Sequence, residues 1–595
     1  MTDRETDVLI VGGGGAGLSA ALMLGDLGVD FLLLERHVGT AIGPKAHIIN
    51  PRTVEAYAPF GFDHEIYASG SPHENNAKVR WITSLGGDGP IDRWNFAEHD
   101  AWGCGRLVEH YAPLSAYRHG NFQQNLLEPK VREYVDARTP GRALFHHEVL
   151  EFGQDSGGVW ATVRDRDTDT TWTARAKYMI GADGGKTVGP SLGIGMGPRM
   201  PFADAINIHM RLDVSEWLQT EDSVVTLVTR PDVSGEWFTA GFLNMGPDRW
   251  DRHASEWILS IMLPPEPDGG EESGLDHDYL LKITRDMLKL PELEVEILSA
   301  NRWLIESAVA ERFCDGRVFL IGDAAHRHSP MGGLGLNSGI QDAHNLTWKL
   351  AHVLRGTADP ALLESFDAER RPVAQRNVDF STTAFFNHHG ATSGFGLFPG
   401  APPEFNAWVL GALASDTEEG RMRRKRLEEY FHTLRWEFEC ADIELGFTYA
   451  DSPAVIPDGT EAPPADPTGH EYIQVARPGH RVPHALFTRD GEEVHPHGLL
   501  RPGGFLLLAG PDGQGWIDAA SALSAQLGVQ IEALRTGAGA DLVPVDGGWA
   551  QLRGHDDAGA VLVRPDGHVA MRAASAAADP QAELDHAMSV ALGGR

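Results

Sequence analysis

The chain has 595 residues, which is too long for one ordinary domain core and predicts three or four structural units. Hydrophobic residues make up 42% and charged residues 23%, a globular composition that excludes wholesale disorder. The 84 acidic residues outnumber the 50 Lys and Arg residues and give a formal net charge of −34. So negative a chain is repelled by nucleic acids and anionic membranes, and we expect neutral or cationic small molecules as its partners.

Cysteine usage and the N-terminus both favour a cytoplasmic protein. Cys104, Cys314 and Cys440 are far apart, without a CxxC pair or a zinc spacing, so we expect neither a disulfide framework nor a metal site. The N-terminus lacks the pattern of a signal peptide, and no uncharged apolar run of 18 residues predicts a membrane-spanning helix. Paired histidines such as His388 and His389 have no third ligand at metal spacing and are expected to be ordinary loop or surface residues.

Residues 7–36 have the pattern of one βαβ unit, with apolar runs at 7–11 and 29–34 around a glycine-rich turn and a helical stretch. The turn, residues 12–17, matches GxGxxG, and Glu35 follows 18 residues after Gly17. Such glycines let a pyrophosphate approach the positive N-terminus of the helix, and Glu35 can accept hydrogen bonds from the adenosine ribose. The unit therefore predicts a dinucleotide site, from which Glu35 would repel a 2′-phosphate.

Two further acidic residues follow strand candidates in the same way. Residues 178–182 lead into Asp183-Gly184, and residues 317–321 lead into Gly322-Asp323 and a glycine-rich helix start. An acid at the end of a strand beside such a helix can bind a ribityl hydroxyl, and the backbone donors that follow can face a flavin ring. Between the two motifs, residues 200–300 alternate polar and apolar types, which predicts an antiparallel sheet that interrupts the nucleotide domain.

The remaining chain predicts helices, a linker and a separate domain. Residues 338–355 and 420–440 have helical patterns, and five prolines within residues 452–467 indicate a linker or surface wrap. Strand candidates at 505–509 and 560–563 enclose a helical stretch at 516–527. This order predicts a small α/β domain from about residue 470.

Taken in this order, the motifs resemble the class A FAD-dependent aromatic hydroxylases, the group of para-hydroxybenzoate hydroxylase. Residues 317–350 and 365–372 match that family closely. Residues 44–55 and 86–90 resemble its phenol-specific members, namely the phenol hydroxylase, 2,4-dichlorophenol 6-monooxygenase and 2-hydroxybiphenyl 3-monooxygenase group. The C-terminal part resembles the thioredoxin-like domain of phenol hydroxylases, but it lacks CxxC, so packing or dimerisation is its expected role.

The resemblance implies an α/β protein with a Rossmann-like FAD-binding domain, an inserted antiparallel β-sheet substrate domain and a thioredoxin-like C-terminal domain. The expected boundaries are 1–190 for the first part of the FAD-binding domain, 191–298 for the substrate domain and 299–400 for the second part of the FAD-binding domain. A helical and Pro-rich linker would cover 401–468, and the C-terminal domain 469–595.

The implied activity is hydroxylation of a phenolic ring by O2 through a flavin C4a-hydroperoxide, with FAD as cofactor and NADPH or NADH as transient co-substrate. Two alternatives stay open: the same chemistry on a larger natural-product phenol or hydroxypyridine, and a catalytically silent flavin-binding scaffold. The expected partners are a small phenolic substrate, O2 and further copies of the chain in a homo-oligomer, without nucleic acid or membrane.

The implied site is specific in its residues. His47 stands where hydroxybiphenyl-type enzymes carry a histidine and is expected to deprotonate the phenol, because a phenolate is the better nucleophile. Trp237 and Phe242 are expected to line the substrate pocket. NAD(P)H is expected to dock near Asp183, although Gly189-Pro190 replaces the Val-Arg pattern of the family there. The expected cofactor-binding residues are Gly12, Gly14, Gly15, Ala16, Gly17, Glu35, Arg36, Gln124, Asp183, Asp323, Pro330, Gly335, Leu336 and Asn337.

Overall fold

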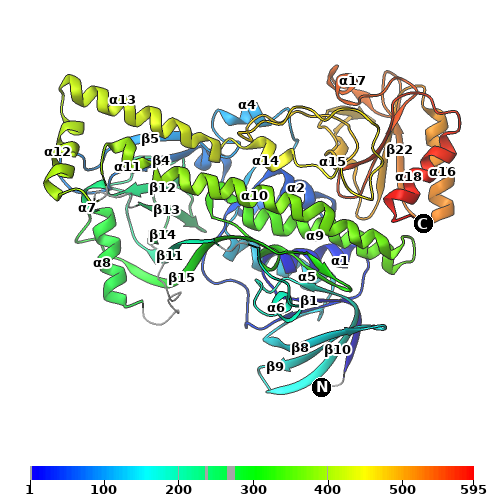
Figure 1. Cartoon of the computed structure of the whole chain (residues 1–595), viewed down its shortest axis with the longest axis horizontal. Helices are drawn as coiled ribbons and strands as arrows, with labels where there is room; N and C mark the ends of the chain where they lie inside the picture. The colour runs from blue at the N-terminus through cyan, green and yellow to red at the C-terminus, as the bar shows by residue number, and fades with distance from the viewer. Residues whose placement is uncertain (1–2, 198–199, 235–238, 264–274, 399, 595) are drawn as a thin grey trace.

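The computed structural model describes residues 3–197, 200–234, 239–263, 275–398 and 400–594. Two long helices, α9 (Leu334–Leu354) and α10 (Ser365–His389), run along the middle of the molecule (Figure 1). The sheet that contains β1 lies below them, and a second sheet lies at one end with α8 (His277–Leu288), α12 (Pro403–Ala414) and α13 (Glu418–His432). The C-terminal unit occupies the other end, so the expected α/β class is confirmed.

The first sheet has the strand order β16-β17-β10-β1-β2-β7, with β9 and β8 continuing from β10. The pairs β1–β2, β1–β10, β10–β17 and β2–β7 are parallel, which suits runs that are buried on both faces, such as residues 8–11 and 31–34. All four strands expected in the nucleotide domain belong to this sheet. Its strands are β1 Arg4–Val11, β2 Phe31–Glu35, β7 Ala143–Phe145, β8 His147–Asp155, β9 Gly158–Asp165, β10 Thr170–Gly181, β16 Cys314–Asp315 and β17 Val318–Leu320.

The parallel pairing brings several strand ends to one edge of this sheet. Val11 is in register with Leu34 and Gly181, and Gly181 is in register with Leu320. The glycine turn after β1, the end of β2, the turn after β10 and the turn after β17 therefore meet. In open parallel sheets, ligands bind at this carboxyl edge. Helix α1 (Gly15–Asp26) starts from the same edge and packs against α5 (Gln124–Arg138) and α9.

The second sheet has eight strands in the order β18-β15-β11-β14-β13-β12-β4-β5. Neighbours are antiparallel except β4 and β12, which are parallel. Strands β4 and β5 come from residues 78–100, far before the segment that the sequence assigned to this sheet, and β15 runs beyond residue 298. The strands are β4 Lys78–Ile82, β5 Asn95–Asp100, β11 Met200–Arg211, β12 Ser223–Thr229, β13 Thr239–Gly246, β14 Glu256–Leu263, β15 Glu296–Val309 and β18 His326–Arg327.

Shorter elements connect the two sheets. Strand β3 (Ile48–Ile49) lies in sequence between β2 and β4, and β6 (Gly120–Asn121) lies between β5 and β7. The two pair as a short ribbon that borders the site described below. No helix in the described ranges combines the length and the apolar character that crossing a bilayer requires. The short helices are α2 Pro51–Tyr57, α3 Asp63–Ser69, α4 Leu107–Tyr111, α6 Val188–Ser191, α7 Pro231–Ser234, α11 Ala391–Phe395 and α14 Ala441–Leu445.

The C-terminal unit has its own core. A four-stranded sheet, β22-β21-β24-β25, carries helices α16 (Gln514–Leu527) and α18 (Pro580–Ala591), whose apolar sides pack with Phe505, Leu507 and Leu562. A smaller sheet, β20-β19-β23, lies in the same unit. Its likeness to thioredoxin stays a prediction. The strands and short helices are β19 Phe487–Arg489, β20 Glu492–Val494, α15 Pro496–Leu499, β21 Phe505–Ala509, β22 Ile531–Arg535, β23 Val543–Pro544, α17 Gly548–Leu552, β24 Ala560–Val563 and β25 Val569–Ala573.

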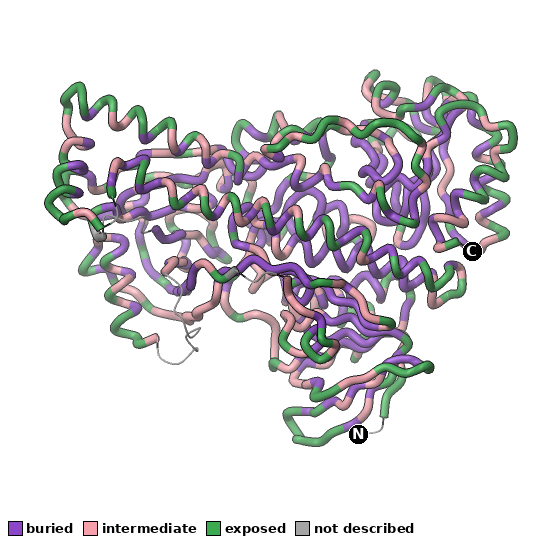
Figure 2. The backbone as a smooth tube through the Cα atoms, viewed as in Figure 1, coloured by how far each residue is buried: buried purple, intermediate pink, exposed green. Residues whose placement is uncertain are grey.

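A buried cluster of charges, which we call the ionic lock, joins the C-terminal unit to α9 and α10. Glu369 of α10 accepts two hydrogen bonds from Arg564, at 2.6 and 2.8 Å, and one from Lys349 of α9 at 2.6 Å. Asp566 pairs with the same guanidinium, and all four side chains are at most 2% exposed. Figure 2 shows that α9 is buried along most of its length, whereas exposed residues lie along α13 and at the tips of β8 and β9.

Candidate active site

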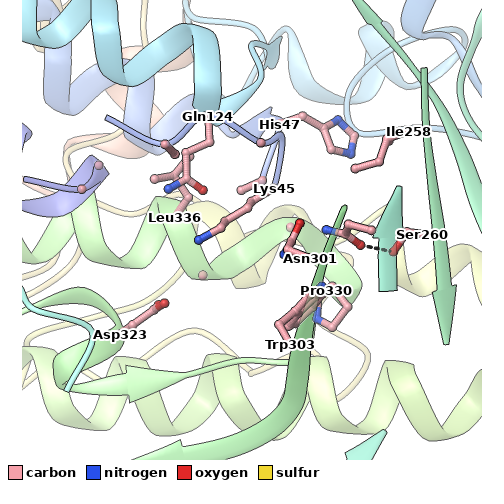
Figure 3. Close-up of a pocket in the computed structure, with 18 of the residues that line it drawn as sticks. Lys45, His47, Gln124, Ile258, Ser260, Asn301, Trp303, Asp323, Pro330 and Leu336 are labelled. Carbon is pink, nitrogen blue, oxygen red and sulfur yellow. Dashed lines mark hydrogen bonds between the residues drawn. The ribbon is translucent and has the colours of Figure 1, made fainter. Parts of the chain in front are cut away.

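A cavity of about 1560 Å³ lies between the carboxyl edge of the first sheet and one face of the second sheet. Figure 3 shows Asp323 toward one end and His47, Ile258 and Ser260 toward the other, with Gln124 and Leu336 between them. Small-molecule sites usually enclose about 300–1,000 Å³, so this volume suits a dinucleotide together with a second molecule.

The glycine turn shapes the nucleotide end of the cavity. Gly12 has φ of +110°, and a Cβ added there would lie 2.3 Å from the carbonyl oxygen of Ala182. A Cβ added at Gly17 would lie 2.1 Å from the carbonyl oxygen of Gly12. These two glycines therefore stand behind the cavity wall and permit close packing. Gly14 differs, because a Cβ there would meet only Glu128 Oε1, at 3.7 Å, and Gly14 lines the cavity with Gly15 and Ala16.

These features fit a pyrophosphate. Helix α1 begins at Gly15 with no side-chain cap and no acidic residue in its first turn, and Gly15 and Ala16 line the cavity, so the positive end of the helix faces the place where an anion would bind. The buried Glu128, which the sequence did not single out, accepts hydrogen bonds from Ala41 N at 2.9 Å and Gln124 Nε2 at 2.6 Å. Burial raises the pKa of this carboxyl, while the hydrogen bonds from Gln124 and from the backbone of Ala41 and Gly15 lower it.

Glu35 lines the cavity at the end of β2, where a ribose is expected. Its Oε2 accepts a hydrogen bond from Gly13 N, and its Oε1 accepts one from His37 N, each at 2.7 Å. Each carboxylate oxygen has a second lone pair, so both can still accept a ribose hydroxyl. Arg36 also borders the cavity, and its Nε lies 3.2 Å from His37 Nε2.

The flavin end collects most of the other expected cofactor residues. Asp323, Pro330, Gly335, Leu336 and Gln124 all line the same cavity. FAD therefore fits the residues present: the N-terminus of α1 for the phosphates, a carboxylate at each expected sugar position, and a glycine-rich loop for the ring.

Besides Gly12 and Gly17, two more of the expected cofactor residues have other roles in the structure. Asp183 does not line the cavity, because its carboxylate accepts hydrogen bonds from the N–H groups of Gly185, Thr187 and Val188 at the start of α6. The side chain of Asn337 is likewise turned away: it donates to Ile48 O at 2.8 Å and accepts from Asn50 N at 3.0 Å. Both side chains therefore stabilise the backbone around the site, and neither one faces the cavity.

His47 lines the cavity immediately before β3, where the cofactor part meets the second sheet. Its Nδ1 lies 2.9 Å from Asn121 Oδ1, and its ring meets Trp102 edge-on with 6.4 Å between ring centroids. Burial lowers the pKa of His47 to about 4, so the imidazole is neutral at physiological pH. A neutral imidazole in a cavity wall can accept a proton from a bound hydroxyl.

The second sheet supplies the other wall, and here the sequence-based assignment of Phe242 is wrong. Gly241 and Leu243 of β13 line the cavity, whereas Phe242 points to the opposite face and stacks on Trp257 with 4.6 Å between ring centroids. Successive side chains of a strand face opposite ways, so only alternate residues can reach the cavity. Trp237 lies outside the described residues. The polar residues on this wall include Asn207, Ser260 and Asn301, and Ser260 donates to Asn207 Oδ1 at 2.8 Å.

One of the other imidazoles that line the cavity was also missed. His388 of α10 is buried and lines the cavity, and its Nε2 lies 2.6 Å from Oε2 of Glu437. Glu437 Oε1 accepts from Gly332 N at 3.3 Å, which ties this pair to the loop beside Pro330. The expectation of a loop or surface histidine is therefore wrong for His388. Glu437 lies 49 residues away in sequence, so no local pattern signals the pair.

Comparison with known proteins agrees with this geometry. The FAD binding domain family matches residues 5–381, and the aromatic-ring hydroxylase C-terminal family matches residues 475–594. The chain is 34% identical to 2,4-dichlorophenol 6-monooxygenase of Delftia acidovorans, over 96% of this chain and 95% of that protein. It is 33% identical to tetracenomycin A2 monooxygenase-dioxygenase of Streptomyces glaucescens, over 99% and 97%. The crystal structure of the flavin-dependent monooxygenase PieE with FAD and substrate superposes with a TM-score of 0.90 at 33% identity, covering all of both chains.

Proposed function

The chain belongs to the FAD-dependent aromatic-ring hydroxylases, and from that premise we propose that it hydroxylates a phenol whose proton is accepted by His47. One observation supports this role most directly: a neutral imidazole lines the cavity where its cofactor part meets its second-sheet wall. As in the family, NAD(P)H and O2 are the co-substrates, and bound FAD supplies the electrophilic oxygen. We propose that Gly14, Gly15, Ala16, Glu35, Arg36, Gln124, Asp323, Pro330, Gly335 and Leu336 hold the FAD.

The pKa of His47 limits how the proton moves. A free phenol has a pKa of ~10, similar to tyrosine. The gap to a pKa of about 4 is roughly 6 units, or about 8 kcal/mol at ~1.36 kcal/mol per unit. Complete transfer to His47 before the ring reacts is therefore too costly. His47 instead accepts a hydrogen bond from the phenol and takes the proton as electron density moves from the phenolic oxygen into the ring.

The cavity volume favours a substrate larger than one benzene ring, which is the second candidate that we propose. If FAD takes about 1,000 Å³, the upper end of ordinary small-molecule sites, about 560 Å³ of the 1560 Å³ is left. That remainder is itself the size of a small-molecule site. Asn207, Ser260 and Asn301 supply several polar groups on its wall, which suits a substrate with oxygen atoms beyond a single hydroxyl.

We also infer that the chain acts in the cytoplasm, because its three scattered cysteines form no disulfide framework. The net charge of −34 favours small-molecule partners over nucleic acid or membrane. A homo-oligomer remains part of this proposal. Light scattering of the purified FAD-loaded protein measures its mass, and a mass of 64.7 kDa at micromolar concentration would contradict the oligomer.

The activity is tested with FAD-loaded protein and a panel of phenols that runs from one ring to several fused rings. NAD(P)H and O2 consumption and the product mass are followed together. His47→Ala should lower the hydroxylation rate at pH 7 at least tenfold while FAD content is retained, because general bases contribute ~10²–10⁴-fold. His389→Ala is the matched control, since His389 is exposed and does not line the cavity. A wild-type rate for His47→Ala with a weakly acidic phenol would place the base elsewhere.

A further inference from the structure

Behind His47, two buried asparagines form a hydrogen-bonded chain that ends on its ring. Pairing of β3 with β6 sets Ile48 in register with Asn121, so that Asn121 lies next to His47. Asn76, at the end of a short helical turn formed by residues 73–76, lies on the other side of Asn121. The two asparagines are 5% and 6% exposed, so their amides cannot satisfy their hydrogen bonds with bulk water.

The direction of each hydrogen bond in this chain follows from its fixed end. The Asn76 side chain lies 2.9 Å from Pro72 O and 3.3 Å from Ser71 O, and carbonyl oxygens can only accept, so Nδ2 of Asn76 faces them. Its Oδ1 must then face Asn121, at 2.7 Å, and only Nδ2 of Asn121 can donate to it. An amide has one oxygen and one nitrogen, so Oδ1 of Asn121 faces His47.

The last link sets the proton on the imidazole. Oδ1 of Asn121 can only accept, so Nδ1 of His47, at 2.9 Å, carries the proton. A neutral imidazole has one N–H, which leaves Nε2 as a bare acceptor. Within the described part of the chain, no residue forms a hydrogen bond with His47 Nε2, and the ring lines the cavity.

We propose that Asn121, oriented by Asn76, fixes the tautomer of His47 so that its unprotonated Nε2 faces the substrate. Both asparagines are thus positioning residues for the proton transfer, and this inference rests on the proposed role of His47. In the opposite tautomer Nε2 would carry a proton, and it would donate to the phenolic oxygen instead of accepting from it. Burial lowers the pKa of His47, and the hydrogen bond with Asn121 raises it. No charged side chain among the described residues contributes appreciably.

Nuclear magnetic resonance of the FAD-loaded protein labelled with ¹⁵N-histidine tests the tautomer directly, with His47→Gln to assign the signal. The wild type should show the proton on Nδ1 and none on Nε2. Asn121→Leu removes the acceptor at nearly constant volume, and the Nε2-protonated form should appear. Asn76→Leu should do the same, because nothing then orients the Asn121 amide. Asn75→Leu is the matched control one residue away. The side chain of Asn75 takes no part in the hydrogen bonds that link Asn76, Asn121 and His47, and donates instead to Glu221 O.

Asn121→Asp is the variant that keeps the acceptor. Its carboxylate should hold the proton on Nδ1 and raise the pKa of His47 by at least one unit, which moves the acid limb of the hydroxylation rate to higher pH. Asn121→Leu should hydroxylate a weakly acidic phenol at least tenfold more slowly than the wild type, with FAD content unchanged. If Asn121→Leu does not fold, Asn121→Asp and Asn76→Leu still decide the question.

The outcomes separate this inference from the proposed function. A wild-type tautomer and rate in Asn121→Leu, together with a slow His47→Ala enzyme, would overturn the role of Asn121 and leave His47 as the base. A wild-type rate in His47→Ala would overturn the proposed role of His47 as the base, even if the spectra showed that Asn121 sets the tautomer. An unshifted pKa of His47 in Asn121→Asp would contradict the contact itself.

Discussion

Removal of one charge from the ionic lock should lower the free energy of unfolding of the C-terminal unit. Two cations, Lys349 and Arg564, face two anions, Glu369 and Asp566, so the buried cluster is neutral overall. Arg564→Met keeps most of the side-chain volume but leaves two carboxylates against one ammonium. Breaking a buried ion pair from one side costs about 3–5 kcal/mol, because the remaining charge is neither hydrated nor paired.

A second substitution checks that charge balance is the cause. Arg564→Met combined with Glu369→Gln leaves Lys349 and Asp566, which are balanced again, so the double variant should be more stable than the single one. Arg535→Met is the control within the same unit. Its partner Asp541 is 42% exposed at the side chain, and such surface pairs are worth about 0–1 kcal/mol.

Hydrogen exchange measured by mass spectrometry gives the opening free energy of individual elements. The informative elements are β24, which ends next to Arg564, and α18, the last helix. The single variant should lose about 3–5 kcal/mol of protection there, while amides of β1 and α1 change little. A loss below about 1 kcal/mol, or an equal loss in the single and double variants, would refute the charge-balance reasoning.

Three further changes test the site and its surroundings. Gly14→Ala adds a methyl group where only Glu128 Oε1 lies within 4 Å, so the fold should persist while FAD affinity falls at least tenfold; Gly411→Ala, also in open space, should leave affinity unchanged. Glu35→Lys should weaken FAD binding at least tenfold, since a charge-assisted hydrogen bond contributes ~1.5–3 kcal/mol, and an unchanged Kd in a flavin titration would contradict its ribose role. Burial lowers the pKa of His344 to about 3 in the folded protein, whereas the same imidazole in the unfolded chain binds a proton near pH 6.5. Stability should therefore fall as the pH drops from about 6.5 towards 3. In urea unfolding, His344→Gln should reduce the loss of unfolding free energy over this pH range by up to about 5 kcal/mol. An unaltered pH dependence would show that other groups cause the loss.

Features that depend on neighbouring residues could be predicted from the sequence. The βαβ unit is local: a glycine turn, one helix and Glu35 lie within 30 residues, and their order dictates which edge of the sheet they share. The strand before Asp323 is equally local. The family resemblance and the aromatic-ring hydroxylase class are confirmed by the comparisons.

Features that depend on distant pairings could not be predicted. Phe242 and Leu243 are both apolar, so alternation alone does not tell which of them faces the cavity. Strands β4 and β5 join the second sheet through pairing between residues more than 100 positions apart, which no period reveals. Asn76 and Asn121 act on His47 only because η2, the turn at residues 73–76, and β6 fold against β3, and an asparagine in a loop has no signature for that role.

The most direct test of the account is the origin of the oxygen in the product. The FAD-loaded protein is supplied with NAD(P)H, ¹⁸O₂ and the phenol that most increases NAD(P)H consumption, and the product is analysed by mass spectrometry. Hydroxylation by O2 should place one ¹⁸O atom on a ring carbon of each product molecule, with one NAD(P)H consumed for each. Oxygen derived from water, or NAD(P)H consumption that yields only hydrogen peroxide with every phenol in the panel, would contradict it.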